Sequence, residues 1–339
     1  MKVLLTGHQG YLGTVMAPVL ERAGHEVVGL DIGWFADCVL GPTPKDPPTL
    51  RKDIRDVTAD DLAGFDAVIH LAALSNDPLG DLAPEITHDI NHAASVRLAT
   101  EAKRAGVGRF LYSSTCSVYG AAGDRLVGED AELAPVTPYA VSKVRVEREL
   151  DGLADDDFCP VSLRNATAFG FSPRLRTDIV LNNLVGHALL TGEVLVLSDG
   201  TPWRPLVHAA DIADVFTAAL VAPAAEVRGA RINVGCEANN VTVAEIAQVV
   251  AEETGASVRI TGSTGNDPRS YRVDFSLLRR LLPQVTVHRS VTDGARELAR
   301  AYREHGMTRE RFEREFVRLA RIRALREGAR LDDDLRGAA

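Results

Sequence analysis

A short apolar segment followed at once by a glycine-rich turn is the feature that most restricts the fold. The segment Val3–Thr6 leads into Gly7, Gly10 and Gly13, and a helical pattern covers Tyr11–Ala23. Gly7 permits a tight turn, Gly10 lets a ligand approach the backbone, and Gly13 lets helix and strand pack closely. The pattern therefore predicts a strand–turn–helix unit whose first N–H groups and helix dipole can hold phosphate groups.

Apolar and helical patterns then alternate along the first half of the chain. Further strands are predicted at Glu26–Asp31, Ala67–Ala72, Arg109–Ser114 and Pro160–Asn165, and further helices at Ile90–Ala105 and Tyr139–Leu153. The strands are rich in Val, Ile and Leu with little polar alternation, which is typical of strands buried on both faces. We therefore expect an α/β fold, a Rossmann doubly wound parallel sheet with a smaller C-terminal substrate domain.

The pattern changes near residue 160, which bears on the domain organisation. A helix is predicted at Ile179–Thr191, and a capping-box pattern opens another after Thr242. We expect a dinucleotide-binding domain, which carries the glycine-rich turn, over residues 1–170 with a return segment near 206–236. The substrate-binding domain and C-terminal helix would then comprise residues 171–205 and 237–339.

Composition limits the classes of partner. The 339 residues carry a formal net charge of −9, which argues against a broad nucleic-acid surface. The Arg-rich tail from Thr308 to Arg330 is predicted to form one long helix, and its interleaved Glu residues favour a solvated or dimer-facing helix over nucleic-acid binding.

No apolar run approaches the roughly 18 residues of a membrane span, and the four cysteines form no CxxC pair. We expect a cytoplasmic protein with reduced thiols, no membrane association and no metal site.

A carboxylate at the end of the second predicted strand bears on the choice of cofactor. Asp31 lies eighteen residues after Gly13, where it can accept hydrogen bonds from the ribose hydroxyls of NAD. The same carboxylate would repel the additional phosphate of NADP. No Arg or Lys follows within Ile32–Phe35, so the sequence predicts NAD.

A tyrosine and a lysine four residues apart are the main candidates for chemistry. Tyr139 and Lys143 share one face of a predicted helix. A free tyrosine has a pKa near 10, and a neighbouring ammonium favours the phenolate and lowers that pKa. The segment Ser113–Gly120 follows a strand, and ligands of such sheets lie at the carboxyl ends of the strands.

These segments together resemble the extended short-chain dehydrogenase/reductase family, also called the NAD-dependent epimerase/dehydratase family, over residues 1–300. The resemblance rests on the Gly-x-x-Gly-x-x-Gly spacing, on Ser113–Gly120 and on Tyr139-x-x-x-Lys143. It implies that Thr115, Tyr139 and Lys143 are catalytic. Tyr139 would take a proton from a sugar hydroxyl while hydride leaves the same carbon for NAD.

The resemblance also implies ligand contacts and an assembly. Contacts to NAD would come from Gly7, Gly10, Tyr11, Leu12, Gly13, Asp31, Asp53, Ile54, Leu71, Ala72, Ala73, Asn91, Ser113, Tyr139 and Lys143. Contacts to a nucleotide-diphosphate sugar would come from Thr115, Asn183, Arg204 and Arg269, and a guanidinium fork suits a diphosphate. A homodimer is implied through the helices predicted at Ile90–Ala105 and Tyr139–Leu153.

The residues after Thr115 bear on the reaction. Members of the family that are 4,6-dehydratases carry Asp and Glu there, whereas this chain carries Cys116 and Ser117, and 4-epimerases carry small residues. The sequence therefore favours epimerisation through a keto-sugar, with a 4-ketoreductase or 4,6-dehydratase as the alternative and an NAD-sensing binding protein as the alternative of another class. Cys116 is either a packed thiol or a base for a C3 or C5 proton. Thr167 stands where the family has a substrate-facing Asn, which leaves the sugar open.

Overall fold

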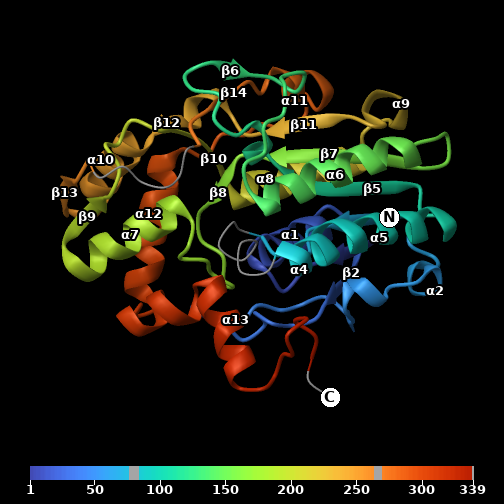
Figure 1. The fold of residues 1–339 in the computed structure, drawn as a ribbon, viewed down its shortest axis with the longest axis horizontal. Helices are drawn as coiled ribbons and strands as arrows, with labels where there is room; N and C mark the ends of the chain where they lie inside the picture. Colours follow the sequence, from blue (N-terminus) through green and yellow to red (C-terminus); the bar gives the residue numbers. More distant parts are fainter. Residues whose placement is uncertain (76–83, 263–268, 338–339) are drawn as a thin grey trace.

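A seven-stranded parallel sheet forms the centre of the molecule in the computed structural model, which describes residues 1–75, 84–262 and 269–337. Its order is β3-β2-β1-β4-β5-β7-β11 (Figure 1). The strands are β1 (Lys2–Thr6), β2 (Glu26–Asp31), β3 (Thr49–Arg51), β4 (Ala67–His70), β5 (Arg109–Thr115), β7 (Cys159–Asn165) and β11 (Arg231–Val234). The strand order reverses between β1 and β4, and this is where a ligand crevice opens in doubly wound sheets. The predicted fold class is confirmed.

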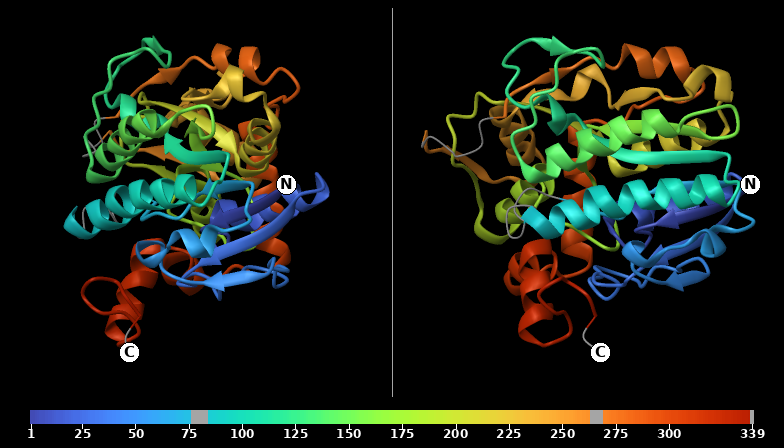
Figure 2. Two further views of the ribbon diagram at one scale, coloured as in Figure 1. Left: turned by 90° about the vertical axis from the view of Figure 1, so that its right-hand side faces the viewer. Right: turned by 45° about the vertical axis from the view of Figure 1, so that its right-hand side comes forward.

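Helices cover both faces of the large sheet (Figures 1 and 2). One face carries α1 (Tyr11–Arg22) and α8 (Ala209–Val221), and the other carries α2 (Ala59–Leu62), α5 (Ala94–Arg104) and α6 (Pro138–Leu153). Alternate side chains of β1 enter the two layers: Val3 and Leu5 pack in the cluster with α1 and α8, and Leu4 packs in the cluster with α5 and α6. The helices α5 and α6 lie side by side, and their pairing with a second copy stays a prediction.

The rest of the chain builds a smaller assembly beyond the carboxyl edge of the sheet. Its strands are β6 (Leu126–Val127), β8 (Thr167–Phe169), β9 (Glu193–Val196), β10 (Trp203–His208), β12 (Asn240–Thr242), β13 (Ser257–Ile260) and β14 (Arg272–Val273). Its main helices are α7 (Val180–Thr191), α10 (Val243–Thr254) and α12 (Val291–Glu304), which share one hydrophobic cluster. The domain bounds themselves stay a prediction. In the described ranges, no helix is long and apolar enough to cross a membrane.

Short helices complete the described chain. They are α4 (Pro84–His88), α9 (Ala224–Val227) and α11 (Ser276–Leu281), the single 3₁₀ turns η1 (Ile54–Asp56), η3 (Cys116–Tyr119) and η4 (Glu237–Asn239), and the π-helical turn η2 (Asp89–Ala93). The helix predicted at Ile90–Ala105 therefore begins as a π-helix before it continues as α5. The capping box predicted at Thr242 is present at the start of α10.

The C-terminal tail is not the single helix predicted over Thr308–Arg330. A π-helical turn η5 (Arg311–Glu315) ends before Phe316, and α13 (Arg318–Glu327) follows (Figure 1). Phe316 is buried in the cluster of α7 and α12, whereas Ile322 is buried in the cluster of the large sheet. The break lets the tail bury apolar side chains in two separate cores. The prediction of one continuous helix was therefore wrong, because tertiary burial outweighed local helix propensity. Whether the tail faces a dimer partner stays a prediction.

A chain of buried hydrogen bonds joins β1, β4 and α5. The Ala72 N–H donates to Thr6 Oγ1 (3.3 Å), and the Thr6 hydroxyl donates to His70 Nδ1 (2.7 Å). His70 Nε2 donates to Ser95 Oγ (2.8 Å), whose hydroxyl donates to the Asn91 carbonyl (2.9 Å). This pattern suits a neutral imidazole, and burial, with a neighbouring ammonium, lowers the pKa of His70 to about 3.

The stability of the protein should therefore fall in acid. The pKa of His70 is about 3 in the folded protein and 6.5 when unperturbed, so the unfolded chain binds more protons between these values. The stability that neutral His70 contributes, on the order of 4 kcal/mol, is complete above about pH 6.5 and is lost as the pH falls toward 3. We expect urea unfolding at a series of pH values to show that His70→Gln is less stable at pH 7 but loses stability less steeply below pH 6.5.

The exposed Gln248 on α10, which does not titrate, offers a control for this measurement. Gln248→Asn should keep the slope of the wild-type protein. A His70→Gln protein whose stability falls as steeply as that of the wild type would contradict the assignment.

Candidate cofactor and catalytic site

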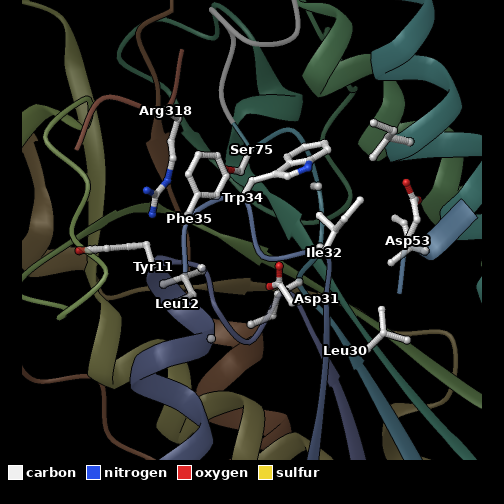
Figure 3. A pocket seen from close by; sticks show the side chains of 18 of the residues that line it. Tyr11, Leu12, Leu30, Asp31, Ile32, Trp34, Phe35, Asp53, Ser75 and Arg318 are labelled. Atoms are coloured by element: carbon white, nitrogen blue, oxygen red, sulfur yellow. The ribbon is translucent and has the colours of Figure 1, made fainter. Parts of the chain in front are cut away.

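The glycine-rich turn forms the floor of a cavity at the carboxyl edge of the sheet (Figure 3). Gly7 has a φ of +73°, and a Cβ there would lie 2.8 Å from the Ala72 nitrogen. A Cβ at Gly13 would lie 2.3 Å from the Gly7 carbonyl oxygen. Gly10 is the N-cap of α1 and makes no side-chain cap, so the first turn of the helix keeps N–H groups for a ligand. The turn fits the pyrophosphate of a dinucleotide.

Most of the predicted NAD contacts line this space, which we call the cofactor cavity. They are Gly7, Gly10, Tyr11, Leu12, Gly13, Asp31, Asp53, Ile54, Leu71, Ala72 and Ala73. Sequence reasoning missed further lining residues, among them Trp34, Phe35, Arg176 and Arg318. Trp34 and Phe35 come shortly after the end of the second strand, and this position in the sequence could have indicated that they line the cavity. Arg176 and Arg318 lie far from the glycine turn in sequence, so only the fold brings them to it.

Asn91 does not line the cofactor cavity. Its Oδ1 accepts from the Leu74 nitrogen (2.7 Å), and its Nδ2 donates to the Leu74 carbonyl (3.0 Å). Asn91 is fully buried on η2. The structure therefore gives it a supporting place beneath the segment 71–75, whereas the sequence predicted a contact with NAD.

Asp31 ends β2 at the position expected for a ribose contact. Its Oδ2 accepts from the Gln9 nitrogen (3.0 Å), and its Oδ1 accepts from the Gly33 nitrogen (2.8 Å). Its register partner on β3 is Arg51, whose guanidinium carbon would lie 3.5 Å from a Cβ at Gly33. The sequence showed no cation close to Asp31, because Arg51 comes near only through the pairing of β2 with β3.

This pair leads to a prediction on cofactor selectivity. Asp31→Asn removes the charge that repels the 2′-phosphate of NADP, while Arg51 stays available to bind that phosphate. We expect the ratio of the NADP to the NAD dissociation constant to fall about tenfold or more, which corresponds to roughly 1.4 kcal/mol. Isothermal titration with both dinucleotides measures this. The double variant Asp31→Asn/Arg51→Gln should lose the gain, and an unchanged ratio in Asp31→Asn would contradict the role of Asp31.

A second space of about 500 Å³, which we call the catalytic cavity, adjoins the first. Its lining includes the predicted positions Ser113, Thr115, Tyr139, Lys143, Asn183, Arg204 and Arg269. It shares Leu12, Leu71, Ala73, Ser75, Ala168 and Arg176 with the cofactor cavity. A ligand in the cofactor cavity can therefore meet a second ligand beside the side chains of β5 and α6.

Lys143 is held at the carboxyl end of β5. Its Nζ donates to the Ser113 carbonyl (2.7 Å) and lies 4.6 Å from the centre of the Tyr112 ring and 5.5 Å from that of the Tyr139 ring. Burial lowers the pKa of Lys143 to about 7, and the carboxylate of Glu147 opposes that shift. The ammonium therefore occupies a fixed place close to Tyr139, and a phenolate there would stabilise its charge.

Thr115 ends β5 and caps η3. Its Oγ1 accepts from the Ser117 nitrogen (3.1 Å) and lies 3.0 Å from Ser117 Oγ, and both side chains line the catalytic cavity. Cys116 points away into the core, where its Sγ donates to the Arg164 carbonyl (3.1 Å). Burial raises the pKa of the Cys116 thiol well above its usual value. Of the two roles left open for Cys116, the geometry fits the packed thiol.

Asn165 and Asp178 are lining residues that sequence reasoning missed. Asn165 is the register partner of Thr115, its Nδ2 donates to Ser113 Oγ (3.0 Å), and its Oδ1 is buried without a hydrogen-bond partner in the described chain. Asp178 is the single carboxylate in the described lining of the catalytic cavity, and it forms an ion pair with Arg176 (2.8 Å). Burial acts to raise the pKa of Asp178, but the charge of Arg176 holds it below its usual value.

The other predicted substrate contacts, Asn183, Arg204 and Arg269, also line the catalytic cavity. Asn183 is on α7, where its Nδ2 donates to the Thr177 carbonyl (2.9 Å). Arg204 on β10 donates to the carbonyls of Trp203 and Arg269. Two arginines, Arg204 and Arg269, thus belong to the lining of the cavity, and such residues suit an anionic ligand.

Comparison with known proteins agrees with this geometry. Residues 3–235 match the model of the NAD dependent epimerase/dehydratase family, and the chain belongs to that family of enzymes. It is 30% identical over 254 residues to a UDP-glucose 4-epimerase of Neisseria meningitidis serogroup C, an alignment that covers 65% of this chain and 73% of that protein.

Solved structures give the same result. The structure resembles that of a UDP-glucose-4-epimerase from Stenotrophomonas maltophila with bound NAD and formylated UDP-arabinopyranose. The two chains are 27% identical and superpose with a TM-score of 0.78, and the match covers 90% of this chain and 99% of the epimerase chain. MoeE5 in complex with UDP-glucuronic acid and NAD has a TM-score of 0.77 and 28% identity, with the same coverage. The residues of the cofactor cavity fit NAD, and NAD is the cofactor of this enzyme.

Proposed function

We propose that the protein is an NAD-dependent epimerase of a nucleotide-linked sugar, which oxidises the sugar transiently at C4 and returns hydride to the opposite face. The observation that carries this proposal is that Thr115, Tyr139 and Lys143 line a cavity that adjoins the cofactor cavity. The names of the relatives support a nucleotide-linked substrate, since they include UDP-glucose 4-epimerases.

Each residue then has a defined part in the chemistry. NAD supplies the hydride acceptor and later the hydride donor. Tyr139 accepts the proton of the sugar hydroxyl and gives it back after the keto-sugar has turned over. Lys143 stabilises the phenolate, and Thr115 orients the reacting oxygen. Arg204 and Arg269 bind the diphosphate, so the sugar can rotate while its nucleotide stays in place.

The acidic groups of the catalytic cavity favour epimerisation over dehydration. A 4,6-dehydration needs an acid and a base for the C5 proton and the C6 hydroxyl. In the described lining, Asp178 alone carries a carboxyl group, and this group forms an ion pair with Arg176. Ser117 lines the cavity where the dehydratases of the family carry Glu, and Cys116 is buried in the core.

The role of Tyr139 can be tested directly. We expect Tyr139→Phe to lower turnover by about 10²-fold or more, because the general acid–base group is lost, while NAD still binds. A thermal-shift screen of UDP-, dTDP-, GDP- and CDP-sugars identifies the substrate, and NMR of its epimers then measures turnover without added NADPH. Tyr302→Phe is the matched control, because this buried phenol donates to the Asn182 carbonyl and lies outside both cavities.

Three outcomes would contradict the proposal in different ways. Retained turnover in Tyr139→Phe would remove the acid–base role. A product that forms only with added NADPH would indicate a ketoreductase, and a 4-keto-6-deoxy product would indicate a dehydratase. NAD binding without conversion of any nucleotide sugar would favour the NAD-sensing protein.

A further inference from the structure

The C-terminal segment places a buried arginine in the cofactor cavity. Arg318 is the first residue of α13, lies beyond the residues that match the family model, and is 2% exposed. Figure 3 shows its guanidinium beside Phe35, directed toward the turn that carries Tyr11 and Leu12. A residue some 300 positions from the glycine turn thus faces it across the cavity.

The charge of Arg318 has little to balance it in the described chain. Its Nη2 donates to the Arg174 carbonyl at 3.3 Å, and its Nη1 is buried with no hydrogen-bond partner. The guanidinium carbon lies 4.1 Å from the centre of the Phe35 ring, and no described carboxylate forms an ion pair with the side chain. Burial, with repulsion from Arg176, lowers the pKa of Arg318 to about 10. A buried cation in a protein is normally paired, so the site favours an anion.

A second guanidinium lines the same cavity. Arg176 donates Nε to Asp178 Oδ1 (2.8 Å), and Asp178 Oδ2 accepts from the backbone nitrogen of Arg318 (3.3 Å). Asp178 therefore pairs with the guanidinium of Arg176 but contacts Arg318 only at its backbone. The two guanidinium groups and this one carboxylate leave a net positive charge on this wall. The opposite wall is the N-terminus of α1, whose dipole is also positive. A ligand with negative charges between the two walls would interact favourably with both.

Packing fixes the segment without any ligand. Phe316, two residues before Arg318, is fully buried. One turn further along α13, Arg321 forms an ion pair with Asp37 and donates Nε to the Trp34 carbonyl (3.2 Å). The guanidinium of Arg318 is therefore oriented in advance, which reduces the entropy that binding costs.

We propose that Arg318 binds the pyrophosphate of NAD, so that the C-terminal segment completes the cofactor site. A guanidinium presents two parallel N–H donors to phosphate oxygens, and the unpartnered Nη1 supplies one of them. The inference concerns cofactor binding alone and holds whichever sugar the enzyme converts.

Titration of the cofactor-free full-length protein with NAD, ADP-ribose and adenosine tests the proposal. Arg318→Met keeps the apolar stem and removes the charge. We expect its dissociation constants for NAD and ADP-ribose to rise about tenfold or more, and that for adenosine, which has no phosphate, to change less than about twofold. The melting temperature without ligand should stay the same or rise, because an unpaired buried charge is lost, while the shift caused by NAD shrinks. Arg323→Met, on the exposed face of α13, is the matched control and should behave as wild type.

The same titrations contain the results that would overturn the proposal. NAD affinity within about twofold of wild type would do so, as would an equal loss for NAD and adenosine, which would indicate a structural role. If Arg318→Met does not fold, Arg318→Lys replaces it, and we expect a smaller loss for NAD with none for adenosine. A wild-type protein that does not bind NAD at all would overturn the cofactor assignment instead.

Discussion

The contact between the buried Lys143 ammonium and the Ser113 carbonyl fixes where chemistry can take place. It ties α6 to the carboxyl end of β5 and holds the positive charge 5.5 Å from the centre of the Tyr139 ring. Because burial lowers the pKa of Lys143 to about 7, its charge depends on what surrounds it. A ribose hydroxyl and a phenolate would both stabilise the charged form, so binding of the cofactor and activation of Tyr139 are coupled in the proposed reaction.

The position of the segment after β4 decides how the two cavities meet. Leu71, Ala73 and Ser75 line both of them, and the backbone of Leu74 is held by the side chain of Asn91. The hydrogen-bonded chain through His70 anchors the start of this segment to β1 and α5. A buried network with every member paired gives such a segment one conformation. This rigidity allows a cofactor on one side to meet a sugar on the other.

The sequence predicted most of what depends on local pattern. It gave the bounds of β2 and the ends of α6 and α7 to within a residue, and the spacing of Tyr139 and Lys143 placed both on one cavity. It missed what depends on packing between distant segments. Arg51 reaches Gly33 through strand register, and Arg318 reaches the glycine turn because the tail breaks at Phe316. Helix propensity alone could not show that break, since the Arg- and Glu-rich tail is compatible with one continuous helix.

In the proposed reaction, hydride leaves one sugar carbon and returns to the same carbon within the joined cavities. A nucleotide sugar deuterated at C4, incubated with the NAD-loaded enzyme in water, tests it most directly. The epimer should keep its deuterium at C4, with no exchange into solvent and no need for added NADPH. An epimer that has lost its deuterium to water would show that a proton, and not a hydride, is transferred at that carbon, and would contradict the account.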